Sequence, residues 1–430
     1  MNSEDKKPNT APSDGQPVPD AADAASAQKS ASADAPGRSA PGGTAGHDAG
    51  SSAFAHTVAP ARATKEAFFR VAKRPAMPAA KNLLMYAVSI LLAIVAGGIF
   101  ILAIGVNPFR FYSVLITGCF RSSLSKIALV RIIVPLLITS LGISLAFRMK
   151  FWNIGAEGQF IMGAVGAAAV GLFCRGLPHF VTLLLMGLAG VLAAGVWGLI
   201  PAFFKCRFGT NETLLTLMLN YIALYLVQYL RDGPWRDPAA GGFPKIAKLP
   251  ETAWIDQLFR MDVSWIVALV LVVFLFVYLR FSKQGYEISV VGDSVQTARY
   301  AGMSVSRIVM RTMFLSAGIC GLGGMLQVAG DSTTHTLTMG IASGVGFTAI
   351  IVAWLARLDP FGIAAVSCLF GVLEKGCGVA ESTFKISSSV SDILQGIILF
   401  IILGTDFFIR YKVYIRHGGG HGSEKEAVSQ

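Results

Sequence analysis

QGYEISVVGDSVQTARYAGMSVSRIVMR, residues 284–311, joins two strongly apolar segments of this 430-residue chain. Gly285 is predicted to end the preceding helix, because glycine enters the left-handed conformation after a helix C-terminus at little cost. Asp293 or Ser294 is suited to cap a new short helix, and Gly302 is suited to end it. The stretch therefore predicts a small helix held across the mouth of a membrane bundle. An ordinary turn is the alternative interpretation.

Two different faces are expected on this short helix. Val295, Ala298 and Ala301 recur at three-residue spacing and form an apolar stripe, while Arg299 and Tyr300 point away from it. The residues concerned are Val295, Ala298, Arg299, Tyr300, Ala301 and Gly302.

The composition is that of a membrane protein. Hydrophobic residues make up 53% of the chain and charged residues only 14%, and the mean hydropathy is +0.60. Soluble domains carry about 25% charged residues. The net charge of +11 lies largely beside apolar segments, so it indicates contact with anionic membrane lipid rather than with nucleic acid.

Ten apolar segments are long enough, or nearly so, to cross a bilayer, which takes about 20 helical residues. The first, 83–104, follows a basic segment at 61–82, which places the N-terminus in the cytoplasm. Residues 1–60 are rich in Ala, Ser, Pro and Gly and are predicted to be a disordered tail. The other segments are 127–147, 154–174, 178–204, 213–230, 263–279, 308–329, 340–356, 361–373 and 390–408.

An even number of crossings with both ends cytoplasmic fits the distribution of Lys and Arg best, although the external loops also carry positive charges. The transmembrane domain is thus predicted at 83–410, followed by a cytoplasmic tail at 411–430. Segments 340–356 and 361–373 are short and interrupted by Gly or Pro, as broken helices are. Small residues recur at four-residue spacing and predict close helix approach, with generic transmembrane composition as the alternative; they are Gly163, Ala167 and Gly171, and then Ser316, Cys320 and Gly324.

The run FRMKFWNIGAEGQFIMG, residues 147–163, places a carboxylate at the start of an apolar segment. Glu157 is expected near the membrane interface or facing the bundle interior, because a charge deep in a span is costly. A plain N-terminal helix cap is the alternative, since the helix dipole favours a carboxylate there.

Polar side chains in the other spans are candidates for lining a solute pathway. Amides can hydrogen-bond hydroxyls or base edges without adding charge, but hydrogen bonding between helices is the favoured alternative. The candidates are Asn211, Glu212, Asn220, Gln228 and Gln327.

Four blocks of the chain resemble one family. They are NIGAEGQ (153–159), RFGTNETLLTLMLNYIA (207–223), ARYAGMSVSRIVMRTMFLSAGICGLGG (298–324) and GFTAIIVAWLARLDPFGIAAVSCLFGVLEKG (346–376). Together they resemble the permease subunits of bacterial ABC importers for nucleosides and simple sugars, a ribose-type group that is similar to branched-chain amino acid permeases. The residues that carry the first motif are Asn153, Gly155, Glu157, Gly158 and Gln159.

The resemblance implies an all-α, type II ABC importer-like bundle of about ten transmembrane helices in the bacterial inner membrane. It implies that ATP and Mg²⁺ bind to a separate cytoplasmic ATPase, which docks on the helix at 295–302. A second permease subunit, identical or different, and an extracytoplasmic substrate-binding protein are the other implied partners. The chain itself has no GxxxxGK[ST] phosphate loop, CxxC pair or metal-ligand spacing. The solute is predicted to be a nucleoside, above all a purine nucleoside, or a simple sugar.

Two alternatives stay open at this point. The same class of importer also carries other small solutes, riboflavin among them. An ion-coupled secondary transporter is the alternative from a different class, although an acidic residue with a charged partner in the middle of a span, which such a transporter needs, is not evident.

Overall fold

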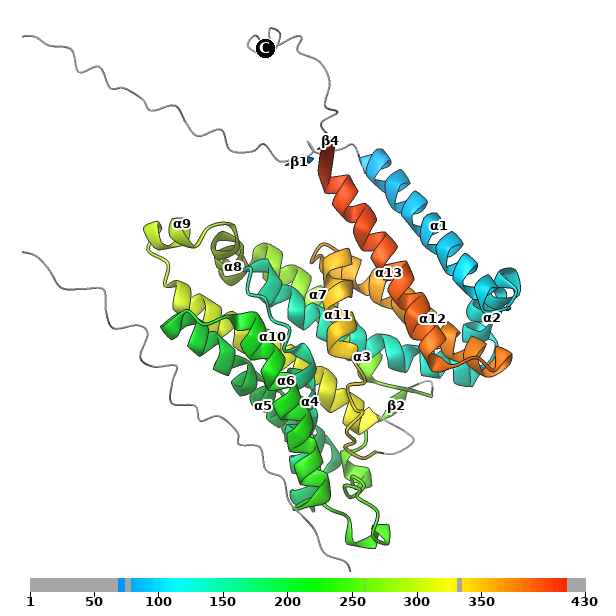
Figure 1. The fold of residues 1–430 in the computed structure, drawn as a ribbon. Helices are drawn as coiled ribbons and strands as arrows, with labels where there is room; N and C mark the ends of the chain where they lie inside the picture. The colour runs from blue at the N-terminus through cyan, green and yellow to red at the C-terminus, as the bar shows by residue number, and fades with distance from the viewer. Residues whose placement is uncertain (1–68, 74–78, 259, 331–334, 416–430) are drawn as a thin grey trace, which may run out of the picture. The chain divides into compact units, whose positions relative to one another are not determined.

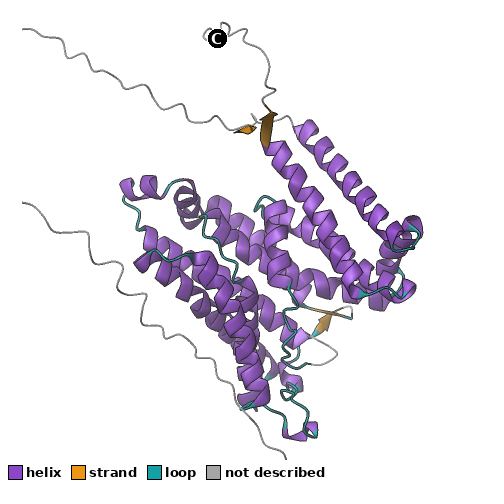
Figure 2. Ribbon diagram, in the orientation of Figure 1, coloured by secondary structure: helices purple, strands orange, loops and turns teal. Residues whose placement is uncertain are grey.

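The computed structural model describes residues 69–73, 79–258, 260–330 and 335–415, and most of them are helical (Figures 1 and 2). The predicted disordered tail at 1–60 lies outside the described residues. The helices are α1 (Ala79–Ala103), α2 (Pro108–Phe120), α3 (Ser123–Arg148), α4 (Ala156–Phe173), α5 (His179–Phe208), α6 (Glu212–Asp232), α7 (Ser264–Phe281), α8 (Lys283–Asp293), α9 (Val295–Tyr300), α10 (Val305–Gly330), α11 (Val345–Leu355), α12 (Pro360–Phe384) and α13 (Ser388–Arg410).

Helix α10 lies at the centre of the main core, where it packs against α3, α4 and α5. The helices approach so closely that backbone touches backbone. A β-carbon added at Gly324 would lie 2.0 Å from the carbonyl oxygen of Phe160, and one at Gly163 would lie 2.2 Å from the Cα of Gly321. The predicted close approach at Gly163 and Gly324 is therefore confirmed, and it explains why small residues are needed there.

A second, smaller core joins α1, α2, α12 and α13. The chain turns sharply between α1 and α2, with a bend of 114°. The side chain of Asn107 caps α2 by accepting hydrogen bonds from the backbone N–H groups of Phe109 and Arg110, and Pro108 occupies the first turn. The sequence did not predict α2, because its buried face, including Phe111 and Leu115, is defined by packing against α12.

Two sequence predictions in the second half of the chain were wrong. Gly285 does not end a helix: it lies buried inside α8, and a β-carbon there would lie 2.5 Å from the carbonyl oxygens of Tyr278 and Leu279. The glycine serves close packing of α8 on the end of α7, and Ser282 separates the two helices. The segment at 361–373 was predicted to be short, but it belongs to α12, which is 25 residues long and ends at Phe384.

Two small sheets accompany the helices in the described part of the chain. Strand β1 (Phe69–Lys73) pairs antiparallel with β4 (Tyr411–Ile415), so segments from both ends of the chain lie side by side (Figure 1). Strands β2 (Gln257–Leu258) and β3 (Met261–Asp262) form a tight hairpin before α7. This hairpin belongs to the long connection between α6 and α7, which also holds the short 3₁₀ helices η1 (Pro238–Ala240) and η2 (Glu251–Ala253).

Seven of the described helices are long and apolar enough to cross a membrane, and the bent α1–α2 pair makes eight if it counts as one span. Helix α11 and residues 392–405 of α13 are shorter apolar helices, and they coincide with two other predicted segments. Large apolar side chains such as Leu91, Leu184 and Val270 are exposed, as expected for surfaces in contact with lipid. The chain is therefore an all-α membrane protein, while the count of about ten crossings stays a prediction.

Candidate functional site

The turn that leads into α4 is fixed by two side-chain amides. Nδ2 of Asn153 donates to Oε1 of Gln159 over 3.0 Å, and Nε2 of Gln159 donates to Oδ1 of Asn153 over 3.1 Å. The same Asn153 oxygen accepts the N–H of Gly155 over 3.1 Å. Both amide side chains are buried, so their hydrogen bonds to one another satisfy groups that would otherwise be costly to desolvate.

Helix α6 is bonded to this turn. The side chain of Asn220 accepts the N–H of Gly158 over 2.8 Å and donates to the carbonyl of Ile154 over 2.9 Å. The hydroxyl of Thr216 accepts the N–H of Ile154 over 3.2 Å. A β-carbon at Gly158 would lie 2.9 Å from Oδ1 of Asn220, so this glycine permits the close approach of α6.

Glu157 binds the N-terminus of another helix. Its Oε1 accepts the N–H of Gly344 over 2.8 Å, and its Oε2 accepts the N–H of Gly346 over 2.6 Å. These N–H groups begin α11, where the first turn has unpaired donors and the positive end of the helix dipole. Gly344 has φ 82°, a conformation that glycine adopts readily. The carboxylate therefore holds a short helix that lies 187 residues away in sequence.

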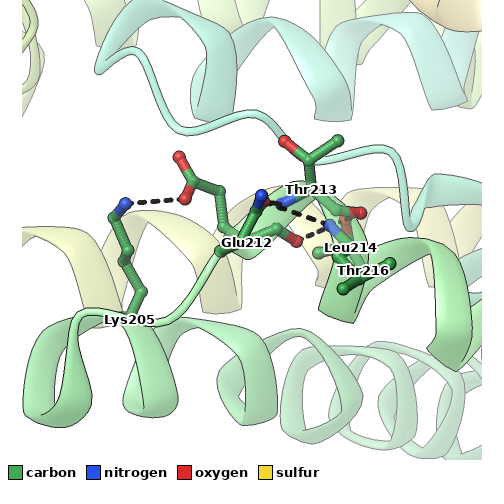
Figure 3. A network of polar contacts seen from close by, with 6 residues as sticks. Lys205, Glu212, Thr213, Leu214 and Thr216 are labelled. Atoms are coloured by element: carbon green, nitrogen blue, oxygen red, sulfur yellow. Dashed lines mark hydrogen bonds and ion pairs between the residues drawn. The ribbon is translucent and has the colours of Figure 1, made fainter.

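Helices α5 and α6 are joined at their adjacent ends by a charged pair (Figure 3). Nζ of Lys205 lies 2.7 Å from Oε2 of Glu212, whose side chain is 11% exposed. Asn211 caps α6 by accepting the N–H groups of Thr213 and Leu214. Gly209, with φ 67°, ends α5 and lets the chain reverse.

These contacts assign structural partners to most of the predicted pathway residues. Asn211 caps a helix, Glu212 is paired with a lysine, and Asn220 bonds the α4 turn, as the alternative of interhelical hydrogen bonding predicts. Gln228 is half-buried on α6. Gln327 differs, because it lines a cavity between helices. A pathway role for the five residues stays a prediction.

The short helix at 295–302 forms as predicted. Its N-cap is Ser294, whose hydroxyl accepts the N–H of Thr297, and Gly302 follows with φ 75°. The expected apolar stripe is only partly buried, because Ala298 is fully buried while Val295 is 42% exposed. Tyr300 is 92% exposed.

Helix α8, which the sequence did not predict, connects the short helix α9 to the helix bundle. A β-carbon at Gly292 would lie 2.0 Å from the carbonyl oxygen of Arg148, so α8 contacts the end of α3 directly. Glu287 on α8 pairs with Arg311 on α10, Oε2 to Nη2, over 2.9 Å. Together with the packing of Gly285 against the end of α7, these contacts connect α8 to three of the long helices.

The family is shown by the sequence itself. Residues 125–403 match the family described as branched-chain amino acid transport system / permease component. This range takes in most of the described helices, including the α4 turn, α6, α8, α9 and α11. The chain belongs to this family of transport permeases.

Individual relatives cover most of the chain. It is 31% identical to the guanosine ABC transporter permease protein NupP of Bacillus subtilis, over 77% of this chain and 95% of the relative. It is 29% identical to the glucose ABC transporter permease protein TsgB13 of Haloferax volcanii, over 76% and 88%. It is 26% identical to the nucleoside ABC transporter permease protein NupB of Lactococcus lactis, over 69% and 84%.

Sequence reasoning overlooked several residues that the structure brings into these sites. Lys205 and Thr216 were not singled out as partners, although a basic residue in the last turn of one helix and a carboxylate in the first turn of the next are a signal of local pairing. The ion pair of Glu287 with Arg311 spans 24 residues and was likewise not singled out.

Proposed function

We propose that this chain is the membrane-spanning permease subunit of an ATP-driven importer for a nucleoside or a simple sugar. Membership of the permease family and the names of the guanosine, nucleoside and glucose relatives support this proposal. The solute is small and hydroxyl-rich in either case, and a purine nucleoside is favoured because the guanosine relative matches 95% of its own length.

The observation that carries the proposal is the α8–α9 unit. Its outer helix exposes Arg299 and Tyr300, whereas α8 is fixed to the ends of α3, α7 and α10. A contact on the exposed side is thereby transmitted to three long helices at once. Such an arrangement suits a permease that draws its energy from a separate ATPase, which would bind ATP and Mg²⁺ itself.

The remaining partners follow from the same proposal. The ATPase docks from the cytoplasm, a second permease subunit completes the pathway, and a substrate-binding protein delivers the solute to the connection between α6 and α7. Pairing of β1 with β4 supports an even number of crossings, because strands directly before α1 and after α13 can pair only on one side of the membrane. The bacterial inner membrane is the location that this assembly requires.

Reconstitution tests the proposal. The permease is copurified with its ATPase and placed in liposomes, and ATP-dependent uptake of labelled guanosine, glucose and riboflavin is measured. Uptake of guanosine or glucose is expected. Uptake of riboflavin alone would favour the flavin alternative, and solute uptake driven by an ion gradient without an ATPase would establish a secondary transporter instead.

Docking is tested on exposed residues, because Ala298 is buried within this chain and its substitution would disturb α9 itself. Arg299→Glu and Tyr300→Ala are expected to reduce both the amount of ATPase retained and the uptake. Phe243→Ala is the matched control for ATPase retention alone, since Phe243 is 77% exposed on the connection between α6 and α7, away from α9 in the chain. Unchanged retention in both α9 variants would exclude this helix as the docking element.

A further inference from the structure

A cavity of about 50 Å³ lies between α3, α7 and α10, next to the β2–β3 hairpin. Its walls are mostly apolar, but a small set of polar groups faces it. These are Arg131, Asp262, Ser264, Trp265 and Gln327. Pockets with apolar walls and a few convergent polar groups are typical of sites for small molecules.

Two hydrogen-bond donors at this cavity have no partner among the described residues. The hydroxyl of Ser264 is one, in a residue that is only 7% exposed, and the indole N–H of Trp265 is the other. A buried donor without a partner is destabilising, and in native proteins such groups usually have a partner in the protein or an ordered water. Both donors belong to the first turn of α7, beside the cavity.

Acceptors face the same space. Asp262, which is 9% exposed, is held through Oδ2 by Nε of Arg131 over 3.1 Å. Pro135 has no N–H, so the carbonyl of Arg131 receives no hydrogen bond from the residue four positions along α3. The amide of Gln327 both donates and accepts.

The chemistry of the guest follows from this mixture. The ion pair cancels its own charge, so the cavity does not select an anion or a cation. Residues with donors and residues with acceptors both line it, and a hydroxyl group is a ligand that both donates and accepts. The volume suits one end of a solute rather than a whole nucleoside, since a single water molecule already needs roughly 10–15 Å³ of such a cavity.

We propose that this cavity binds the hydroxyl groups of a neutral, polyhydroxylated solute during transport. The proposal rests on the proposed function, and it deepens it by naming the recognition chemistry. The cavity lies beside the connection between α6 and α7, where the solute would arrive from the binding protein. Guanosine and glucose share vicinal hydroxyls, so one site of this kind can serve either.

Uptake by the reconstituted importer gives the first test. Wild-type protein is expected to prefer guanosine over 2′,3′-dideoxyguanosine by about tenfold or more, because losing a bonded hydroxyl leaves site groups unpaired. Trp265→Phe keeps the ring and removes the N–H, and Ser264→Ala removes the hydroxyl; each is expected to lower that preference severalfold. Trp354→Phe, on α11, is the matched control and is expected to leave the preference unchanged. The proposal would be overturned if the wild-type protein and all three variants preferred guanosine over 2′,3′-dideoxyguanosine by the same factor.

Thiol labelling gives a second test that needs no transport. Ser264→Cys is made in a chain whose exposed or partly exposed cysteines (Cys174, Cys206 and Cys368) are replaced by serine. Guanosine, glucose or sorbitol at millimolar concentration is expected to slow modification of the new cysteine by a small thiol reagent. Ala239→Cys on the external connection serves as the control and should be unaffected.

The two tests fail in different ways. Absent uptake with protection intact would refute the proposed function and leave the hydroxyl site standing. Absent protection by every polyol would show that the cavity holds water only and overturn the proposal. Protection by leucine instead of the polyols would overturn it too, since an amino acid is a charged zwitterion.

Discussion

Replacing Glu157 by glutamine should release the start of α11. The carboxylate accepts the N–H groups of Gly344 and Gly346 over 2.8 and 2.6 Å, and each charge-assisted bond contributes about 1.5–3 kcal/mol. Glutamine retains one acceptor and turns an NH₂ group toward the second N–H. The variant is therefore expected to lose about 3 kcal/mol of local stability, which corresponds to a roughly 100-fold shift in the opening equilibrium.

Amide hydrogen exchange measures this change directly. In Glu157→Gln protein, peptides that cover α11 are expected to exchange faster by on the order of 100-fold, while peptides from α5 keep their rate. Glu251→Gln is the control, because Glu251 is exposed on η2. If α11 exchanges at the wild-type rate in both Glu157→Gln and Glu157→Ala, then the carboxylate does not hold this helix.

Three further predictions concern packing and coupling. Gly324→Ala would press a β-carbon onto a backbone oxygen at 2.0 Å and should cost about 3 kcal/mol, seen as a lower Tm in detergent, whereas Gly378→Ala has open space and should not. Glu287→Gln breaks the pair with Arg311 and should cost only about 1 kcal/mol of stability, because both side chains are partly exposed. It should nevertheless lower solute-stimulated ATP hydrolysis, and the charge-reversed pair is expected to restore it. Normal stimulation in the single variant would contradict the coupling role. Asn220→Leu should leave the buried N–H of Gly158 and the partly buried carbonyl of Ile154 unpaired and destabilise the protein by about 2–4 kcal/mol in a thermal melt; an unchanged melt would show that water replaces the amide.

The sequence predicts most of the fold, because long apolar runs and the residues that end helices act locally. The cap at Ser294 and the turn at Gly302 follow from the properties of single residues and were predicted correctly. Gly285 was misassigned because a glycine serves equally at a helix end and at a tight contact, and only the neighbouring backbone decides between the two. Helix α2 was missed because its buried face is defined by a helix more than 200 residues later.

The candidate sites were harder to predict for a related reason. The sequence placed Glu157 at the start of α4, where it lies, but its partners at Gly344 and Gly346 are distant in the chain. Asn220 is an amide within an apolar helix, and its bonding to the α4 turn rather than to a pathway depends on the register of α6 against α4. The cavity donors Ser264 and Trp265 carry no local pattern that marks them.

Pairing of β1 with β4 also has a consequence for how the gene can be rearranged. Phe69 lies opposite Ile415 in the sheet, so the ends of the described fold meet and the chain resembles a ring with one break. A circular permutant, with these ends linked and new ends opened in another connection, keeps every contact between helices. The order in which the helices are synthesised is thus separable from the order in which they pack.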